Sequence, residues 1–229
     1  MQIIPAIMPN NINDMREKMA QVIGACSLVQ LDIMDGKFVK SKTFPFNPKD
    51  ADFIEQILSE EEALPYWQEL DVEFDLMVLN AHKNFDMYVS LGPKRIIFHI
   101  EAEGNPIEFQ EFLEGIDMYT RENIEIGIAI NNDTPIENLY PFVPYVSFVQ
   151  FMGIKNIGYQ GEAFDERVLD RIEVFHTKYP DVVISVDGSV NEDTIGMLIE
   201  KGATRFVIGS ALFDSFDPRE KIFEFENML

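Results

Sequence analysis

Short runs of apolar, β-branched and aromatic residues recur along the chain, and segments of helical periodicity lie between them. Each run has the length of one buried strand, so the pattern predicts eight strands. They cover Ile3–Met8, Leu28–Met34, Val72–Val78, Arg95–Ile100, Ile124–Ile130, Val146–Met152, Val182–Val186 and Arg205–Ile208. The segments between and after them predict helices over Ile12–Ile23, Ala51–Leu58, Ile107–Tyr119, Asp165–Thr177, Glu192–Lys201 and Pro218–Met228.

Strands that alternate with helices pair in parallel, because each helix carries the chain back across the sheet. Eight such units in 229 residues predict a (β/α)8 TIM barrel of the α/β class, with a single domain over residues 1–229. An open sheet of the flavodoxin or Rossmann type is the alternative. It is disfavoured because no Gly-x-Gly-x-x-Gly motif follows the first predicted strand.

The composition is that of a globular domain with an acidic surface. Hydrophobic residues make up 46% of the chain, and the net charge is −22. This charge argues against a nucleic-acid partner and against binding to an anionic membrane. The single cysteine, Cys26, excludes an intrachain disulfide and fits a reducing compartment. With no secretory leader and no apolar run of membrane-spanning length, we expect a cytoplasmic protein.

Two predicted strand-to-helix links are unusually long, Asp35–Pro48 and Gly153–Phe164. In a barrel these links build the active face, so both are candidate lids or substrate-binding loops. Side chains alternate between the barrel interior and the helix layer, which places several polar and sulfur-containing residues inside, near the carboxyl ends of the strands. They are Gln30, Asp32, Met34, Asp75, Met77, His99, Gln150, Met152, Ser185 and Asp187.

Three of these residues are carboxylates, and a carboxylate inside a barrel is costly unless it is paired or bound to a metal ion. One aspartate could simply cap the next helix, but Asp32, Asp75 and Asp187 together indicate a functional cluster. Methionine is a common filler of protein cores. The inward methionines are therefore either core residues or a polarizable pocket wall, and the sequence leaves both open.

Glycines mark the ends of the last two strands, at Gly188-Ser189 and Gly209-Ser210. In barrels these two loops often bind phosphate through backbone N–H groups. Two ordinary tight turns are the alternative. Because both pairs stand at matching strand ends, we expect a phosphate-binding site.

With these residues in view, the chain resembles the ribulose-phosphate 3-epimerase family. The matching blocks follow one another in family order at barrel spacing, and each block alone is weakly specific. They are Ile4–Met8, Val29–Val39, Asp75–Val78, Phe98–Ala102, Gly127–Pro135, Val186–Val190 and Gly209–Phe213.

The resemblance implies a TIM barrel of the ribulose-phosphate-binding type that inverts C3 of a ketopentose 5-phosphate. Asp32 and Asp187 match the two aspartates that exchange protons with the two faces of C3 through an enediolate. The remaining matches are the pocket methionines Met34, Met77 and Met152 and the phosphate-binding residues Gly188, Ser189, Gly209 and Ser210. The link Gly153–Phe164 matches the family's mobile loop.

The chain departs from the family pattern at three positions: the family usually has Ser at Ala6 and His at Gln30 and Asp75. The two histidines hold a divalent metal ion in the family, together with the aspartates. Gln30, Asp32, Asp75 and Asp187 would instead form an all-oxygen site, which favours Mg²⁺ or Mn²⁺ over Zn²⁺ or Fe²⁺. The alternative is a metal-free pocket, in which a neutral carboxyl such as that of Asp75 donates a hydrogen bond to the enediolate.

Three functions are therefore compatible with the sequence. An isomerase acting on a sugar phosphate is favoured, because a binding protein has no need for two opposed carboxylates. A barrel that binds sugar phosphates without catalysis is second. A decarboxylase or aldolase is third, because Lys37 is the only lysine near the expected site. The particular ketose phosphate stays open, and so does the oligomeric state, for which a homo-oligomer is one option.

Overall fold

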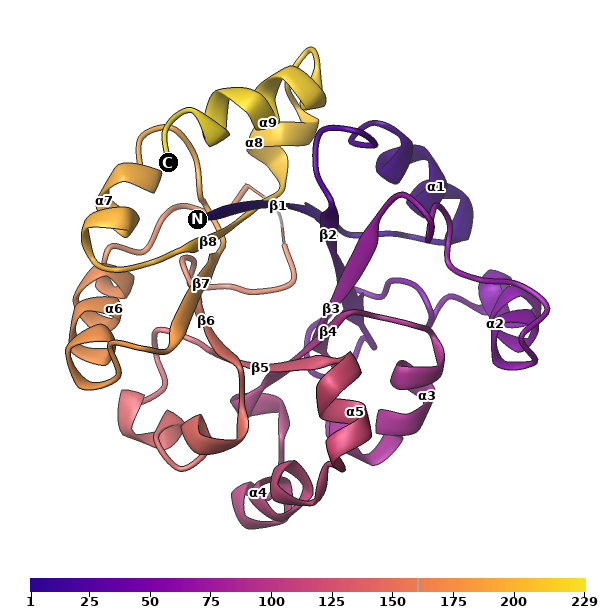
Figure 1. Cartoon of the computed structure of the whole chain (residues 1–229), viewed down its shortest axis with the longest axis horizontal. Helices are drawn as coiled ribbons and strands as arrows, with labels where there is room; N and C mark the ends of the chain where they lie inside the picture. Colours follow the sequence, from indigo (N-terminus) through magenta and orange to yellow (C-terminus); the bar gives the residue numbers. More distant parts are fainter. Residues whose placement is uncertain (160) are drawn as a thin grey trace.

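The computed structural model describes residues 1–159 and 161–229, and over this range eight parallel strands close into a barrel (Figure 1). Each strand pairs with the next, and β1 pairs with β8. The strands are β1 Gln2–Ile7, β2 Leu28–Met34, β3 Asp71–Met77, β4 Arg95–His99, β5 Glu125–Ile130, β6 Phe148–Met152, β7 Val183–Asp187 and β8 Arg205–Ile208. The predicted TIM barrel is confirmed, and its predicted strands are correct to within two residues at each end.

The helices form a ring around the strands (Figure 1). The α-helices are α1 Ile12–Ala20, α2 Ala51–Leu58, α3 Phe85–Ser90, α4 Pro106–Gly115, α5 Met118–Asn123, α6 Arg167–Lys178, α7 Ile195–Glu200, α8 Ser210–Phe213 and α9 Pro218–Glu226. Short 3-10 helices cover Pro48–Asp50, Ala81–Asn84, Ile100–Ala102, Ile136–Leu139 and Val143–Tyr145.

The prediction of one helix over Ile107–Tyr119 is wrong, because the chain turns between α4 and α5. Ile116 has an extended backbone, and the Asp117 carboxylate accepts a hydrogen bond from the Thr120 N–H group at 3.0 Å. This contact satisfies a free N–H group at the start of α5 and so begins a new helix. The short helices α3 and α8 were not predicted, because neither is long enough to show a hydrophobic period.

The alternation predicted for β2 is confirmed. Leu31 and Ile33 pack in the large cluster between the strands and the helices, whereas Gln30 and Asp32 are buried inside the barrel. The side chains inside the barrel therefore come from the second face of each strand, as the strand period requires.

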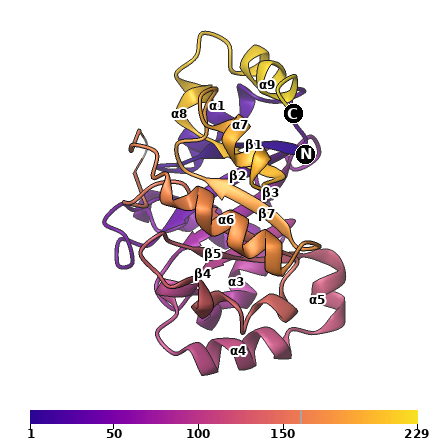
Figure 2. The ribbon, with the colours of Figure 1, turned by 90° about the vertical axis from the view of Figure 1, so that its left-hand side faces the viewer.

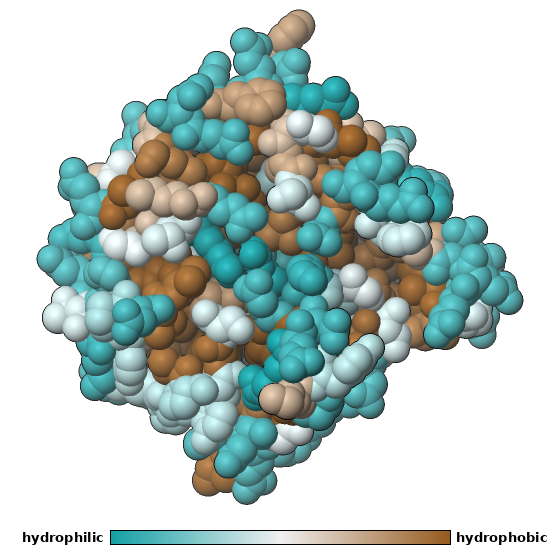
Figure 3. Space-filling view, viewed as in Figure 1, coloured by the Kyte–Doolittle hydropathy of each residue, from teal (hydrophilic) through white to brown (hydrophobic). Residues whose placement is uncertain are grey.

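The amino-terminal end of the barrel, which we call the floor, is closed by ion pairs and one aromatic ring. Arg95 contacts Glu73 at 3.2 Å and Glu125 at 3.1 Å, and Arg205 contacts Glu125 at 3.0 Å. The Arg205 guanidinium also lies 4.5 Å from the centre of the Phe148 ring. Figure 3 shows hydrophilic residues in the middle of this face. The floor is therefore filled by packed and paired side chains.

The carboxyl end of the barrel, which we call the mouth, carries the two long links. Asp35 bridges Lys42, and Ile154 bridges Phe164, so each link is closed at its base by antiparallel pairing. Figure 2 shows both links at the end of the barrel opposite the termini. No helix in the described residues is both long and apolar enough to cross a membrane.

Candidate active site

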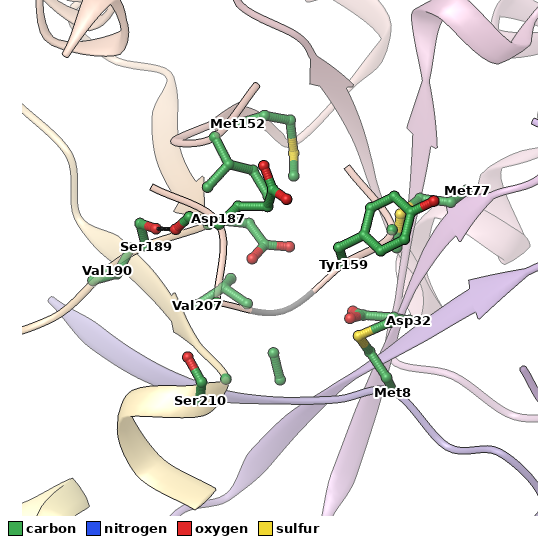
Figure 4. A pocket seen from close by; sticks show the side chains of 17 residues that line it. Met8, Asp32, Met77, Met152, Tyr159, Asp187, Ser189, Val190, Val207 and Ser210 are labelled. Carbon is green, nitrogen blue, oxygen red and sulfur yellow. Dashed lines mark hydrogen bonds between the residues drawn. The ribbon is translucent and has the colours of Figure 1, made fainter. Parts of the chain in front are cut away.

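Three strands bring the three predicted aspartates together at the mouth. Asp32 and Asp75 are register partners on β2 and β3, and Asp187 ends β7. One oxygen atom of each carboxylate lies within 4.8 Å of the corresponding atoms of the other two. Asp32 and Asp75 are buried, and Asp187 is half-buried. Figure 4 shows that Asp32 and Asp187 point into one pocket from opposite sides.

Gln30 connects two of these carboxylates. Its side-chain amide nitrogen donates to Asp32 Oδ1 at 2.9 Å and to Asp187 Oδ2 at 2.8 Å. Gln30 Oε1 is buried and has no hydrogen-bond partner among the described residues. The amide was predicted to offer its oxygen to a metal ion, but here it acts toward both aspartates as a hydrogen-bond donor. Gln30 therefore fixes the relative orientation of Asp32 and Asp187.

Asp75 is paired with a histidine that the sequence analysis left without a role. His99 Nε2 lies 2.8 Å from Asp75 Oδ1, and both side chains are fully buried. Within the described part of the chain, Asp75 Oδ2 and His99 Nδ1 have no partner. Strand alternation does place His99 inward at the end of β4, next to β3, and this signal could have identified the pair.

The carboxyl groups of Asp32 and Asp187 bind protons more tightly than ordinary aspartates do. Burial raises the pKa of Asp32 well above its ordinary value, and the charges of Asp187 and Asp75 raise it further. Burial, with the charge of Asp75, raises the pKa of Asp187 to about 7. For His99, burial favours the neutral ring, but the charge and hydrogen bond of Asp75 outweigh burial and raise the pKa. Buried carboxyl groups that raise one another's pKa values favour states in which they share protons, which is the arrangement that proton transfer requires.

The pocket beside the aspartates has a wall of methionines. Met77 and Met152 line it as predicted, together with Met8, which the sequence analysis did not single out (Figure 4). Met34, the register partner of Met77, packs in a cluster with Met77 and Val39 and is not among the residues that line the pocket. The methionines provide a polarizable apolar surface next to the charged groups.

The four predicted phosphate-binding residues lie in the same pocket. Gly188, Ser189, Gly209 and Ser210 all line it. Gly188 has a φ of +104°, which strongly favours glycine, and an added Cβ would collide with Ile154. The Ser189 hydroxyl donates to the backbone oxygen of Glu162, which connects this turn to the long link after β6.

The donor atoms at the aspartates suit a divalent cation. Three carboxylates converge there, and the buried Oδ2 of Asp75 lacks a partner in the described residues. Carboxylate oxygens are the ligands that Mg²⁺ and Mn²⁺ prefer. The acidic triad can therefore hold a metal ion, although two histidines of the family pattern are replaced.

Sequence comparison places this geometry in a family. The model of the ribulose-phosphate 3-epimerase family matches residues 2–213. The chain belongs to this family.

Relatives in the ribulose-phosphate 3-epimerase family match over nearly the whole chain. The ribulose-phosphate 3-epimerase of Candida glabrata is 26% identical over 225 residues, which cover 96% of this chain and 89% of that protein. The cytoplasmic isoform from Oryza sativa is 26% identical over 196 residues, which cover 85% of this chain and 78% of that protein. These matches confirm the resemblance and the prediction of an enzyme of the isomerase class.

Solved structures agree with the barrel fold. A 3-hexulose-6-phosphate synthase has a TM-score of 0.67 and 17% identity, and the match covers 100% of both chains. The KGPDC from Streptococcus mutans, solved in complex with D-R5P, has a TM-score of 0.68 and 13% identity, and covers 98% of this chain and 95% of that one. At these identities the likeness confirms the fold alone.

Proposed function

We propose that this protein inverts C3 of ribulose 5-phosphate or xylulose 5-phosphate, or of a close ketose phosphate. The observation that carries the proposal is the placement of Asp32 and Asp187 on opposite sides of one pocket (Figure 4). The two Gly-Ser pairs line the same pocket, and Gly188-Ser189 directly follow Asp187. Relatives at 26% identity over 225 residues are named ribulose-phosphate 3-epimerases.

In the proposed mechanism one aspartate is ionised and the other is protonated. The ionised carboxylate removes the proton from C3, and the electron pair of the C–H bond moves through C2 to the ketone oxygen. The resulting enediolate then takes a proton at the opposite face of C3 from the second carboxyl group. The pKa of Asp187, raised to about 7, supports its role in proton transfer, because catalytic groups work best near the operating pH, and the pKa of Asp32 is raised in the same direction.

Gln30 and His99 act as positioning residues in this mechanism. Gln30 donates to Asp32 at 2.9 Å and to Asp187 at 2.8 Å, so neither carboxylate can turn out of the pocket without losing a hydrogen bond. His99 holds one oxygen of Asp75 at 2.8 Å and leaves the other free. Small errors in such geometry reduce rates strongly, which is why both contacts matter.

Asp32, Asp75 and Asp187 would hold a divalent metal ion, Mg²⁺ or Mn²⁺ by the chemistry of their oxygens. Bound there, the ion would supply Lewis-acid stabilisation of the negative charge that develops on the substrate oxygens. The metal-free alternative uses a neutral carboxyl, such as that of Asp75, as a hydrogen-bond donor to the same charge. Assays with chelator and with each added metal ion distinguish the two.

The phosphate group is proposed to bind between Gly188-Ser189 and Gly209-Ser210 through backbone N–H groups. Both pairs line the pocket, and Ser189 has a φ of +53°, a conformation that turns successive N–H groups toward one side. Crystals soaked in phosphate should show the anion there. An anion found only elsewhere would contradict this part of the proposal.

A coupled assay on ribulose 5-phosphate tests the function directly, and incorporation of solvent deuterium at C3 tests the mechanism. Turnover without deuterium at C3 would rule out proton exchange by the two aspartates. Binding of ribulose 5-phosphate without turnover would favour the second candidate, a non-catalytic sugar-phosphate-binding barrel. The replacement of two metal-binding histidines of the family pattern by Gln30 and Asp75 supports that candidate.

A further inference from the structure

The link between β2 and α2 is basic, in a chain whose net charge is −22. Residues 35–50 contain four lysines and two aspartates, Asp35 and Asp50, both of which are buried. All four lysines are exposed, and none of them forms an ion pair among the residues that the structure describes; they are Lys37, Lys40, Lys42 and Lys49. Several lysines elsewhere do pair with carboxylates, among them Lys18, Lys83, Lys201 and Lys221.

The base of this link is firmly attached to the mouth of the barrel. The Thr43 hydroxyl donates to the backbone oxygen of Asp32 at 2.7 Å and accepts from the Met34 N–H group at 2.8 Å. The Asp35 carboxylate accepts from the N–H groups of Lys37 at 2.8 Å and Leu79 at 3.1 Å. The lysines therefore project from a fixed position next to the aspartates.

The same link contacts the second long link, which covers the pocket. The Ser41 hydroxyl donates to the backbone oxygen of Gly158 at 2.8 Å. Lys40 lines a surface groove together with Tyr159 and Glu162, and both of these residues also line the pocket of the aspartates. Lys40 thus lies beside the entrance to the candidate active site.

We propose that Lys37, Lys40 and Lys42 attract the anionic substrate to the mouth of the barrel. This inference rests on the proposed function, which gives the substrate a phosphate group. The protein's overall negative charge repels a phosphate, and lysines at the entrance that form no ion pair among the described residues offset part of this repulsion locally. The three lysines act before the chemical step and at long range, so they determine the apparent affinity and leave the rate of the bound substrate unchanged.

The test compares two variants with the same loss of charge. The first carries K37Q, K40Q and K42Q. The matched control carries K94Q, K178Q and K201Q, which lie at the floor, because Lys94 precedes β4, Lys178 ends α6 and Lys201 follows α7. Calorimetry measures the binding of inorganic phosphate and of ribulose 5-phosphate to the full chain at about 0.02 M and about 0.5 M salt, where screening lengths differ several-fold.

At low salt we expect the mouth variant to bind both anions about five- to tenfold more weakly than the natural chain, with less than about twofold loss at high salt. The control should lose less than about twofold at both salt concentrations, and kcat should stay unchanged in both variants. Equal losses in the two variants would overturn the proposal, since net charge alone would then explain them. A loss that persists at high salt would also overturn it, because it would indicate direct contact.

These outcomes are separate from the fate of the proposed function. If the natural chain binds phosphate with the expected salt dependence but does not epimerise ribulose 5-phosphate, the attraction of anions stands and the epimerase proposal fails. If the natural chain epimerises ribulose 5-phosphate but the mouth variant and the control lose the same affinity, the epimerase proposal stands and the proposed attraction by the lysines fails.

Discussion

The two ends of the barrel interior both bury charged side chains, but only one end balances them. At the floor, Glu73 and Glu125 face Arg95 and Arg205, so two carboxylates meet two guanidinium groups. Glu73 is 1% exposed, and its pKa is raised by burial to about 7 although Arg95 opposes the shift. The charges at the floor therefore balance one another, although Glu73 Oε1 and Arg205 Nη1 have no hydrogen-bond partner among the described residues.

At the mouth, three aspartates converge, and among the described residues the one ion pair they form is that of Asp75 with His99. Glu73 and Asp75 lie two residues apart on β3 and point to the same side of the strand, so one strand serves both ends. The difference indicates that buried charges stabilise the fold where each has a partner of opposite sign. Where negative charge is in excess, it requires a proton or a cation, and this marks the candidate active site.

The largest expected effect comes from removing one proton-transferring group at the mouth. Asp187→Asn should lower kcat by about 10²–10⁴-fold, because the amide cannot transfer the C3 proton. The matched change at the floor, Glu73→Gln, should leave kcat within about threefold, because Glu73 contacts Arg95 and lies outside the pocket. Both variants are compared in the ribulose 5-phosphate assay. Equal losses in the two would refute the distinction between the ends.

The next effect tests whether His99 is the partner that keeps Asp75 buried. His99→Leu should reduce the free energy of unfolding by about 3–5 kcal/mol, because it leaves an uncompensated buried carboxylate. Asp75→Leu combined with His99→Leu should recover much of this loss, since no charge is then left unpaired. Urea unfolding measures both. If the double variant is as unstable as the sum of the two single variants, the pair is not coupled.

The sequence predicted the strands well because buried parallel strands are continuous apolar runs with inward polar exceptions, as in Leu28–Met34. The same alternation correctly placed Asp32, Asp75 and Asp187 on one side of the sheet. Prediction from the sequence failed where local contacts determine the end of an element. The break before Asp117 depends on one helix cap, which competes with an otherwise continuous helical pattern.

The partners within the site were harder to predict than its members. Strand alternation shows that Gln30 and His99 face inward, but not which atoms they contact. The direction of the Gln30 amide depends on the distance between Asp32 and Asp187, which closure of the barrel sets. Met34 shows the same limit: its inward orientation was predicted, but it packs in a cluster with Val39 and Met77 and is not among the residues that line the pocket. The alternation of side chains along a strand determines which face of the sheet a residue lies on. Its contacts depend on how all the strands of the barrel pack together.

A smaller effect is expected when a metal ion balances the excess negative charge of the aspartates at the mouth. Mn²⁺ or Mg²⁺ at about a hundred times its dissociation constant should stabilise chelator-treated protein by about 2.7 kcal/mol, through binding to the folded state only. Asp75→Ala should abolish this stabilisation, whereas Glu73→Gln at the floor should preserve it. Thermal unfolding and calorimetry measure the effect without any substrate. No binding at millimolar metal would favour the metal-free pocket.

The smallest expected effect is at the floor, where Cys26 serves as a probe of the end of the barrel that does not bind ligand. Cys26 lies near the start of β2, and burial raises the pKa of its thiol to about 11. Only the thiolate is nucleophilic, so the labelling rate should rise about tenfold per pH unit between about pH 8 and pH 10 and level off above the pKa. Ribulose 5-phosphate or Mn²⁺ at the mouth should leave this rate within about twofold, because the ion pairs at the floor need no ligand to balance them. Labelling that slows strongly when a ligand binds would show that the two ends are coupled, and would contradict the independence of floor and mouth.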